Sequence, residues 1–245
     1  MKRFVKTCLS RMGLYVKFRE NLPAGFDWIL DIQRNLHLRS EPVVFDVGAN
    51  LGQTVKEIKQ RLPNARLHAF EPVESSFAQL EVVASRFSSV TCHQLALGAA
   101  PSTERIKVVP LASRNSLVAT TLVDDEKAIE QEIEISTVDD VCAKHQISAI
   151  DILKTDTEGY DLNVLRGAEG LLGRGAVNAV YVEVGFADAH PQCSAFQPIY
   201  DFLIERGFRF SGLYDLYWLQ RKPWPEAWCN ALLLREEIAD QGLIP

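Results

Sequence analysis

Cysteine is scarce in this sequence, and its spacing is irregular. Five cysteines occur among the 245 residues without any C-x-x-C pair: Cys8, Cys92, Cys142, Cys193 and Cys229. An odd number without paired spacing argues against a disulfide framework and against a structural zinc site. We therefore expect reduced thiols, the ordinary state of cysteine in a cytoplasmic protein.

Excess positive charge and long apolar runs are also missing. The net charge is −6, which argues against a nucleic-acid partner held by a general positive field. No uninterrupted apolar run reaches the roughly 18 residues of a membrane span. With 47% hydrophobic and 24% charged residues and no repeats, the composition is typical of a globular protein with one substantial core.

Residues 1–20 interleave basic and apolar side chains. Charge interrupts this segment too often for the apolar stretch of a secretory signal. Two readings stay open. The segment is either a basic amphipathic helix that lies on a partner or on the inner face of an anionic membrane, or a helix that caps the domain. The sequence by itself sets no oligomeric state.

The segment VVFDVGANLG at residues 43–52 is the most informative feature that is present. Its first five residues are mostly β-branched or aromatic, which predicts a buried strand. A small-residue turn follows, and then a helix with Val55, Ile58 and Leu62 on one face. A strand, a glycine turn and a helix N-terminus together predict a nucleotide-type cofactor site at the carboxyl end of a parallel strand.

The residues of this turn indicate which cofactor binds. Only Gly48 and Gly52 are present, with Asn50 between them, so the third glycine of the G-x-G-x-x-G pyrophosphate turn is missing. Asp46 places a negative charge where phosphates would lie and suits a cationic ligand. S-adenosyl-L-methionine (SAM) carries a sulfonium and an ammonium and has no phosphate. The turn therefore favours SAM over the cofactor of an NAD-type oxidoreductase, the main rival enzyme.

A second acid supports this reading. Residues 66–71 predict another strand that ends in Glu71, 25 residues after Asp46. That offset is close to the roughly 20 residues that separate a dinucleotide turn from its ribose-binding acid. A carboxylate at this position can accept hydrogen bonds from both ribose hydroxyls. Pro72 ends the strand.

These segments resemble the main blocks of the FkbM-type SAM-dependent methyltransferases. The matching stretches are FDVGANLG (45–52), AFEP (69–72), LALG (95–98), ILKTDTEG (152–159), VLRGA (164–168) and YVEV (181–184). The resemblance covers roughly residues 42–235. It implies an α/β, doubly wound, mostly parallel seven-stranded sheet, the Rossmann-like class I methyltransferase fold, with strand order 3-2-1-4-5-7-6.

The chain is predicted to have two parts, an N-terminal helical extension over 1–40 and a SAM-dependent methyltransferase domain over 41–245. Strands and helices alternate after residue 42, which is typical of a parallel sheet. Predicted strands are 43–47, 66–71, 89–94, 150–155 and 178–184. Residues 104–110 and 131–136 predict extra strands around a polar insertion. The stretches 208–219 and 230–234 lack a helix between them, which predicts an antiparallel hairpin at the sheet edge.

Four residues are candidates for catalysis. Asp156 and Glu158 follow the strand 150–155, where ligands of open α/β sheets bind, although either acid could instead cap the next helix. Glu183 ends the strand 178–184, and the alternative there is an ion pair, for example with Lys154. His190 lies in the next loop as a candidate base or as an ordinary surface histidine.

The candidate cofactor-binding residues are Asp46, Gly48, Asn50, Gly52, Glu71, Pro72 and Asp156. The predicted function is an O-methyltransferase that uses SAM. The resemblance implies a sugar hydroxyl of a glycan, glycolipid or nucleotide sugar as acceptor. This chemistry requires no metal, because the enzyme has mainly to align the acceptor oxygen with the methyl carbon. The alternative to an enzyme is a subunit that binds SAM without catalysing a reaction.

Overall fold

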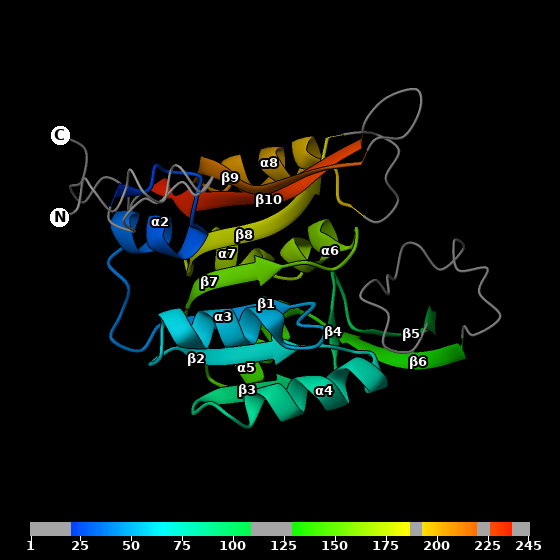
Figure 1. Cartoon of the computed structure of the whole chain (residues 1–245). Helices are drawn as coiled ribbons and strands as arrows, with labels where there is room; N and C mark the ends of the chain where they lie inside the picture. The colour runs from blue at the N-terminus through cyan, green and yellow to red at the C-terminus, as the bar shows by residue number, and fades with distance from the viewer. Residues whose placement is uncertain (1–20, 109–128, 187–192, 220–225, 237–245) are drawn as a thin grey trace, which may run out of the picture.

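A computed structural model describes residues 21–108, 129–186, 193–219 and 226–236. Its main feature is a seven-stranded sheet with helices on both faces (Figure 1). In spatial order the strands are β3 (Val90–His93), β2 (Arg66–Phe70), β1 (Val43–Val47), β7 (Ile150–Thr155), β8 (Val177–Gly185), β10 (Glu226–Arg235) and β9 (Phe208–Leu219).

This order confirms the predicted doubly wound fold. The five strands from β3 to β8 run parallel, and β10 pairs antiparallel with β8 and β9. The hairpin of β9 and β10 therefore lies at the sheet edge as predicted, although β10 is longer than the segment 230–234. Because parallel strands start from the same side, the carboxyl ends of β1, β2, β7 and β8 meet at one edge.

Two apolar cores hold the layers together. One face of the sheet packs on α2 (Trp28–Asn35), α3 (Gln53–Arg61) and α4 (Glu74–Ala84). The other packs on α5 (Val138–Lys144), α6 (Asp161–Arg166), α7 (Glu169–Gly173) and α8 (Phe196–Ile204). Helix α3 shows the predicted pattern, since Val55 and Ile58 have no exposed surface. Within the described ranges no helix is long and apolar enough to cross a membrane.

The predicted N-terminal extension contributes α2 to the first of these cores. Asp27 caps α2 by accepting the N–H of Leu30, and the Trp28 ring stacks on Tyr181 of β8 at 4.3 Å. Residues 1–20, for which membrane contact or capping was predicted, lie outside the described part of the chain. The division into an extension and a domain stays a prediction.

The extra strands predicted around the polar insertion are present. They form a small sheet separate from the main one, and the sequence pattern did not predict this separate sheet. It consists of β4 (Ala96–Leu97), β6 (Ile129–Ser136) and β5 (Ser102–Val108), in that order. Strands β5 and β6 run antiparallel and project beyond the carboxyl edge of the main sheet (Figure 1). Ile106, Ile133 and Ile135 join Val73 and Ala96 in a third apolar cluster. The small sheet therefore packs against the loop that follows β2.

Candidate active site

A cavity of about 340 Å³ opens at the carboxyl edge of the main sheet, beside the small sheet. Its polar lining comes from the turn after β1, the start of α3, the segment from Glu71 to Ser76 and the loop after β7. Its apolar lining includes Val73, Leu95, Ala96, Leu97, Ile106 and Ile133. The cavity thus has an apolar side next to the small sheet and an acidic side at Asp156 and Glu158.

The turn after β1 needs its glycine for two reasons. Gly48 has a φ of +80°, and a Cβ on it would lie 1.9 Å from the carbonyl oxygen of Asp156. The two loops therefore touch only because residue 48 lacks a side chain. Asn50 also has a positive φ, 47°, a left-handed backbone that asparagine tolerates better than most residues.

Hydrogen bonds within the protein use most of the amide groups of this turn. Gly48 and Ala49 donate their N–H groups to the carbonyl oxygen of Phe70, at 3.0 and 2.9 Å. Asn50 donates its N–H to Oε2 of Glu71 at 3.0 Å. Pyrophosphate binding in a dinucleotide turn requires such amides to face the ligand. This geometry disfavours the NAD-type reading.

Glu71 joins the turns after β1 and β2. Its carboxylate accepts the N–H of Asn50 and, through Oε1, the N–H of Val73 at 2.9 Å. The side chain is 7% exposed and lines the cavity. Burial raises the pKa of Glu71 to about 7, although the two N–H donors act in the opposite direction. Each carboxylate oxygen retains a second lone pair for a ligand hydroxyl.

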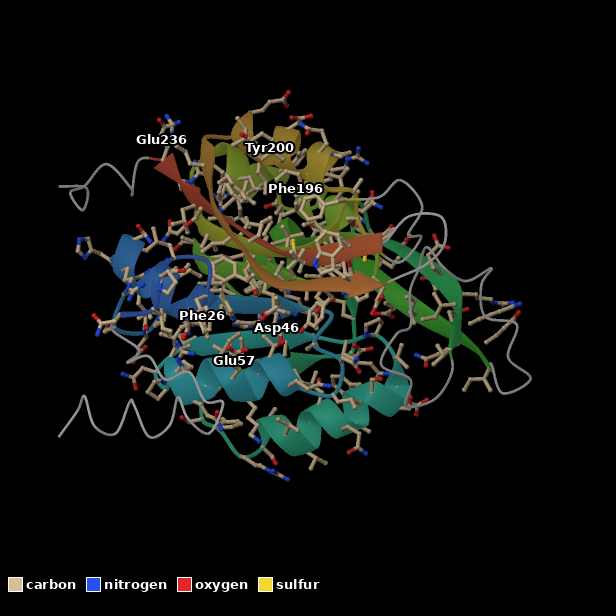
Figure 2. The ribbon with its side chains drawn as sticks, turned by 45° about the horizontal axis from the view of Figure 1, so that its top comes forward. Phe26, Asp46, Glu57, Phe196, Tyr200 and Glu236 are labelled. Carbon is tan, nitrogen blue, oxygen red and sulfur yellow. The ribbon has the colours of Figure 1, made fainter. Side chains whose placement is uncertain are left out.

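The structure corrects the role predicted for Asp46. Its side chain is completely buried, does not line the cavity, and forms an ion pair with Nζ of Lys154 at 3.0 Å. The reason is strand alternation: Asp46 points to the same face as Val44, beneath α3 (Figure 2). Lys154 already pairs with Asp46, and Asp46 is not among the residues that line the cavity.

Lys154 connects this buried pair to the cavity. Its Nζ also lies 3.5 Å from Oδ2 of Asp156, whose side chain is 39% exposed. Burial alone would lower the pKa of Lys154, but the charges of Asp46 and Asp156 outweigh burial and raise it. The lysine therefore stays protonated and holds Asp156 at the edge of the cavity. The ion pair predicted as an alternative for Glu183 is formed by Asp46 instead.

Asp156 and Glu158 both line the cavity, and neither caps α6. The first N–H of α6, that of Asp161, donates to Oγ of Ser194 at 3.2 Å, while the Asp161 carboxylate accepts the hydroxyl of Ser194 at 2.9 Å and the N–H of Thr157 at 3.1 Å. Glu158 has a positive φ of 52°, and Gly159 follows with 97°. The capping alternative therefore does not explain the two acids.

Glu183 lies behind this acidic side, near the end of β8. It is partly buried and does not line the cavity itself. Burial raises the pKa of Glu183 to about 9, and the negative charges of Asp156, Glu158 and Asp161 add to the shift, while Lys154 opposes it. The thiol of Cys193 lies 3.9 Å from Oε2 of Glu183. Three acids from adjacent strand ends thus lie close enough to influence one another, and two of them line the cavity.

The remaining predicted site residues lie in different parts of the protein. Pro72 lines the cavity. Gly52 is buried, and a Cβ there would lie 3.1 Å from Val83 of α4, so Gly52 serves helix packing. His190 lies outside the described residues. Lining residues that the sequence argument missed include Gln53, Thr54, Ser76, Ile106, Ile133 and Tyr160. The signal that could have found Ile106 and Ile133 is the alternation of apolar and polar residues in β5 and β6.

Comparisons with known proteins agree with this geometry. The sequence model of the family described as methyltransferase FkbM domain matches residues 46–210 of this chain. The chain is 32% identical over 165 residues to 31-O-demethyl-FK506 methyltransferase FkbM of Streptomyces tacrolimicus, covering 56% of this chain and 64% of that protein. It is 26% identical over 166 residues to methyltransferase sdnD of Sordaria araneosa, covering 54% and 62%.

The solved structure of methyltransferase FkbM from Methylobacillus flagellatus KT has a similar fold. Its TM-score is 0.51 at 16% identity, over 79% of this chain and 45% of that one. The alignments thus span less than two thirds of the length of these relatives. SAM is the cofactor expected from the turn, and the matched family is one of methyltransferases. Since the family model matches more than half of the sequence, the chain belongs to the FkbM methyltransferase family.

Proposed function

We propose that this chain is a SAM-dependent O-methyltransferase whose acceptor is a hydroxyl of a sugar in a glycan, glycolipid or nucleotide sugar. The observation that carries the proposal is one cavity with Glu71 on its wall, the Asp156 and Glu158 carboxylates at its acidic side and Glu183 behind them. The name of the Streptomyces relative, a 31-O-demethyl-FK506 methyltransferase, supports an oxygen acceptor.

The residues of the cavity fit this cofactor. Glu71 holds free lone pairs for the two ribose hydroxyls. The carboxylates of Asp156 and Glu158 attract a cationic ligand. When it is bound, SAM supplies a methyl group on a positively charged sulfur. The turn after β1 is in close contact with the carbonyl group of Asp156 through Gly48, and this contact sets the position of the cavity wall between Glu71 and the acidic side.

The acidic side supplies a base for the acceptor. A sugar hydroxyl is a weak nucleophile, so a carboxylate that takes its proton aids attack on the methyl carbon. The carboxylate would take the proton of the acceptor hydroxyl, while the bound cofactor would supply the methyl group and keep the electron pair of its C–S bond. Burial and neighbouring charges raise the pKa of Glu183 to about 9, so this carboxyl is protonated near neutral pH and must ionise before it can serve as the base. A cation bound beside it would lower that value and make ionisation easier.

Two alternatives remain to be separated from this proposal. His190 could take the proton in place of Glu183, and the chain could bind SAM without catalysis. Transfer of label from SAM to components of a fractionated cell extract tests both the activity and the acceptor. Label that stays entirely on SAM with every fraction would favour the non-catalytic subunit.

Cofactor binding provides a direct test through Glu71. Glu71→Ala should weaken binding of S-adenosylhomocysteine at least about tenfold, because it removes charge-assisted hydrogen bonds. Glu71→Gln should be milder, since one acceptor oxygen remains. Because the pKa of Glu71 is about 7, wild-type affinity should fall as the pH drops below 7 and the carboxyl takes up a proton.

Calorimetry from pH 5.5 to 8.5 measures these affinities. Glu81→Ala, on the exposed side of α4, is the matched control and should bind as wild type does. Tighter binding of NAD than of S-adenosylhomocysteine would overturn the proposed cofactor. Unchanged affinity in Glu71→Ala would place the ribose elsewhere.

A further inference from the structure

The hairpin of β9 and β10 carries aromatic side chains to the carboxyl edge of the main sheet. Trp228 lies opposite Gly185, the last residue of β8, so this end of the hairpin stands beside the strand that carries Glu183 (Figure 1). Trp228 pairs with Tyr217 of β9, and the two rings stack with 5.8 Å between their centroids. Tyr217 is 53% exposed. An aromatic surface is therefore open to solvent next to the candidate base.

Asn230 lies directly opposite Glu183 on the neighbouring strand. The two residues are register partners in the antiparallel pair of β8 and β10, so their side chains are on one face of the sheet, with Cβ atoms about 4.5–5.5 Å apart. Trp228 comes two residues before Asn230 on β10 and is therefore on the same face. A carboxyl group, an amide group and a pair of stacked rings thus adjoin one another at the end of β8.

The amide oxygen of Asn230 is unusual among these groups. Its Oδ1 atom is buried and has no hydrogen-bond partner among the residues that the structure describes. Buried polar atoms in native proteins are nearly always hydrogen-bonded, because an unpaired one loses its water without gaining a partner. An unpaired acceptor oxygen beside a carboxyl group therefore suits a ligand that brings its own donor, and a hydroxyl is such a donor.

A sugar ring offers the groups that complement this face. Its C–H face is apolar and packs on aromatic rings, and each of its hydroxyls donates one hydrogen bond. Since one hydroxyl has only one proton, a second hydroxyl is needed for Asn230 when Glu183 takes the proton of the first. Resting on the proposed function, we propose that Glu183 and Asn230 bind two adjacent hydroxyls of the acceptor sugar. The stacked rings of Tyr217 and Trp228 form the wall for its apolar face, and the methyl group goes to the hydroxyl at Glu183.

Periodate oxidation tests the chemistry of the acceptor. The probe is the cell-extract fraction that takes label from SAM with the wild-type protein. Periodate breaks the carbon–carbon bond between two adjacent carbons that each carry a hydroxyl. After the excess periodate is quenched, the fraction should have lost nearly all its capacity to take label, whereas a mock-treated sample keeps it. Full labelling after complete oxidation would overturn the subsite for two adjacent hydroxyls and leave the methyltransferase activity standing.

Variants of the hairpin test the residues. Asn230→Leu removes the amide oxygen at similar side-chain volume. The amount of the accepting fraction needed for half-maximal transfer should rise about tenfold, while the KM for SAM and the affinity for S-adenosylhomocysteine stay unchanged. Asn230→Asp keeps an acceptor oxygen and should recover most of this loss. Tyr217→Ala should act like Asn230→Leu. Trp218→Ala is the matched control, because this neighbouring aromatic residue is 61% exposed but points to the opposite face of β9.

An unchanged acceptor requirement in Asn230→Leu would overturn the subsite, and the proposed function would stand. An equal rise in the KM for SAM would also overturn it, because Asn230 would then support the cofactor site. If wild type labels no fraction, the proposed function fails, and the melting temperature of Asn230→Leu decides the subsite. Loss of an unpaired buried oxygen should raise that temperature by about 2–4 °C. No rise would show that the oxygen is not kept unpaired for a ligand.

Discussion

At the scale of single residues, Glu183 combines a proposed catalytic task with a cost in stability. Burial and the nearby carboxylates raise its pKa from 4.5 to about 9. Between these two pH values the unfolded chain has already released the proton that the folded protein still holds. The unfolded state binds fewer protons, so stability decreases as the pH rises through this range.

We expect Glu183→Gln to separate the two effects. The variant removes the titrating group, so its melting temperature relative to wild type should increase from pH 5 to pH 9. If Glu183 is the base, turnover should drop by roughly 10²–10⁴-fold, and the ascending limb of the pH profile should disappear. Melting curves and kcat across this pH range, with S-adenosylhomocysteine affinity as a check on binding, measure both.

His190→Ala tests the alternative that His190, and not Glu183, is the base. Full turnover in Glu183→Gln together with a strong loss in His190→Ala would identify the histidine as the base. Loss of turnover in Asp156→Asn alone would point instead to the acid that Lys154 holds at the cavity.

At the scale of elements, α2 is attached to the far edge of the sheet through one buried acid. The Oδ2 atom of Asp31 accepts the hydroxyl of Tyr214 on β9 at 2.9 Å and the N–H of Gly25 at 2.8 Å. The guanidinium of Arg34 lies 3.2 Å from Oδ1. Asp31 is 2% exposed, so these partners replace the water that its carboxylate loses on folding.

Tyr214→Phe should therefore lower the free energy of unfolding by about 1.5–3 kcal/mol, the range for a hydrogen bond to a charged group. Tyr217→Phe is the control, because Tyr217 is on the same strand and is 53% exposed. Urea denaturation of both variants gives the comparison. Equal stability of the two variants would show that the hydrogen bond from Tyr214 to Asp31 does not stabilise the fold.

At the scale of the whole molecule, two histidines set the response to acid. The Nδ1 of His68 on β2 lies 3.1 Å from Nε2 of His93 on β3, and the His93 ring stacks on Phe70 at 4.5 Å. Burial lowers the pKa of both to about 4; His145 adds to the shift of both, and His68 adds to the shift of His93. Phe70 lines the cavity, so this pair lies directly behind the candidate active site.

Stability should decrease as the pH falls from about 6.5 to about 4. In that range the unfolded chain binds protons that the folded protein excludes, so acid favours unfolding. The double variant His68→Leu/His93→Phe removes both partners of the hydrogen bond and should flatten the acid limb. Melting temperatures at pH 7 and pH 4.5 give the result. An unchanged acid limb would assign acid sensitivity to other groups.

The sequence by itself determined the order of the elements, the strand-turn-helix unit and the two loops that carry Glu71 and Asp156. These features follow from local periodicity and from the backbone that Gly48 and Asn50 adopt, which neighbouring residues largely dictate. The resemblance to a family added the strand order. The predicted hairpin at the edge followed from two strands without an intervening helix.

Only the tertiary structure decided which charged groups pair and which residues reach the cavity. Asp46 and Lys154 are far apart in sequence but lie opposite each other on neighbouring strands, so no local pattern could pair them. Gln131 contacts Pro72 and Glu74 for the same reason. Periodicity reports how deeply a side chain is buried, whereas ion pairs and hydrogen bonds depend on distances through space that arise when the strands assemble.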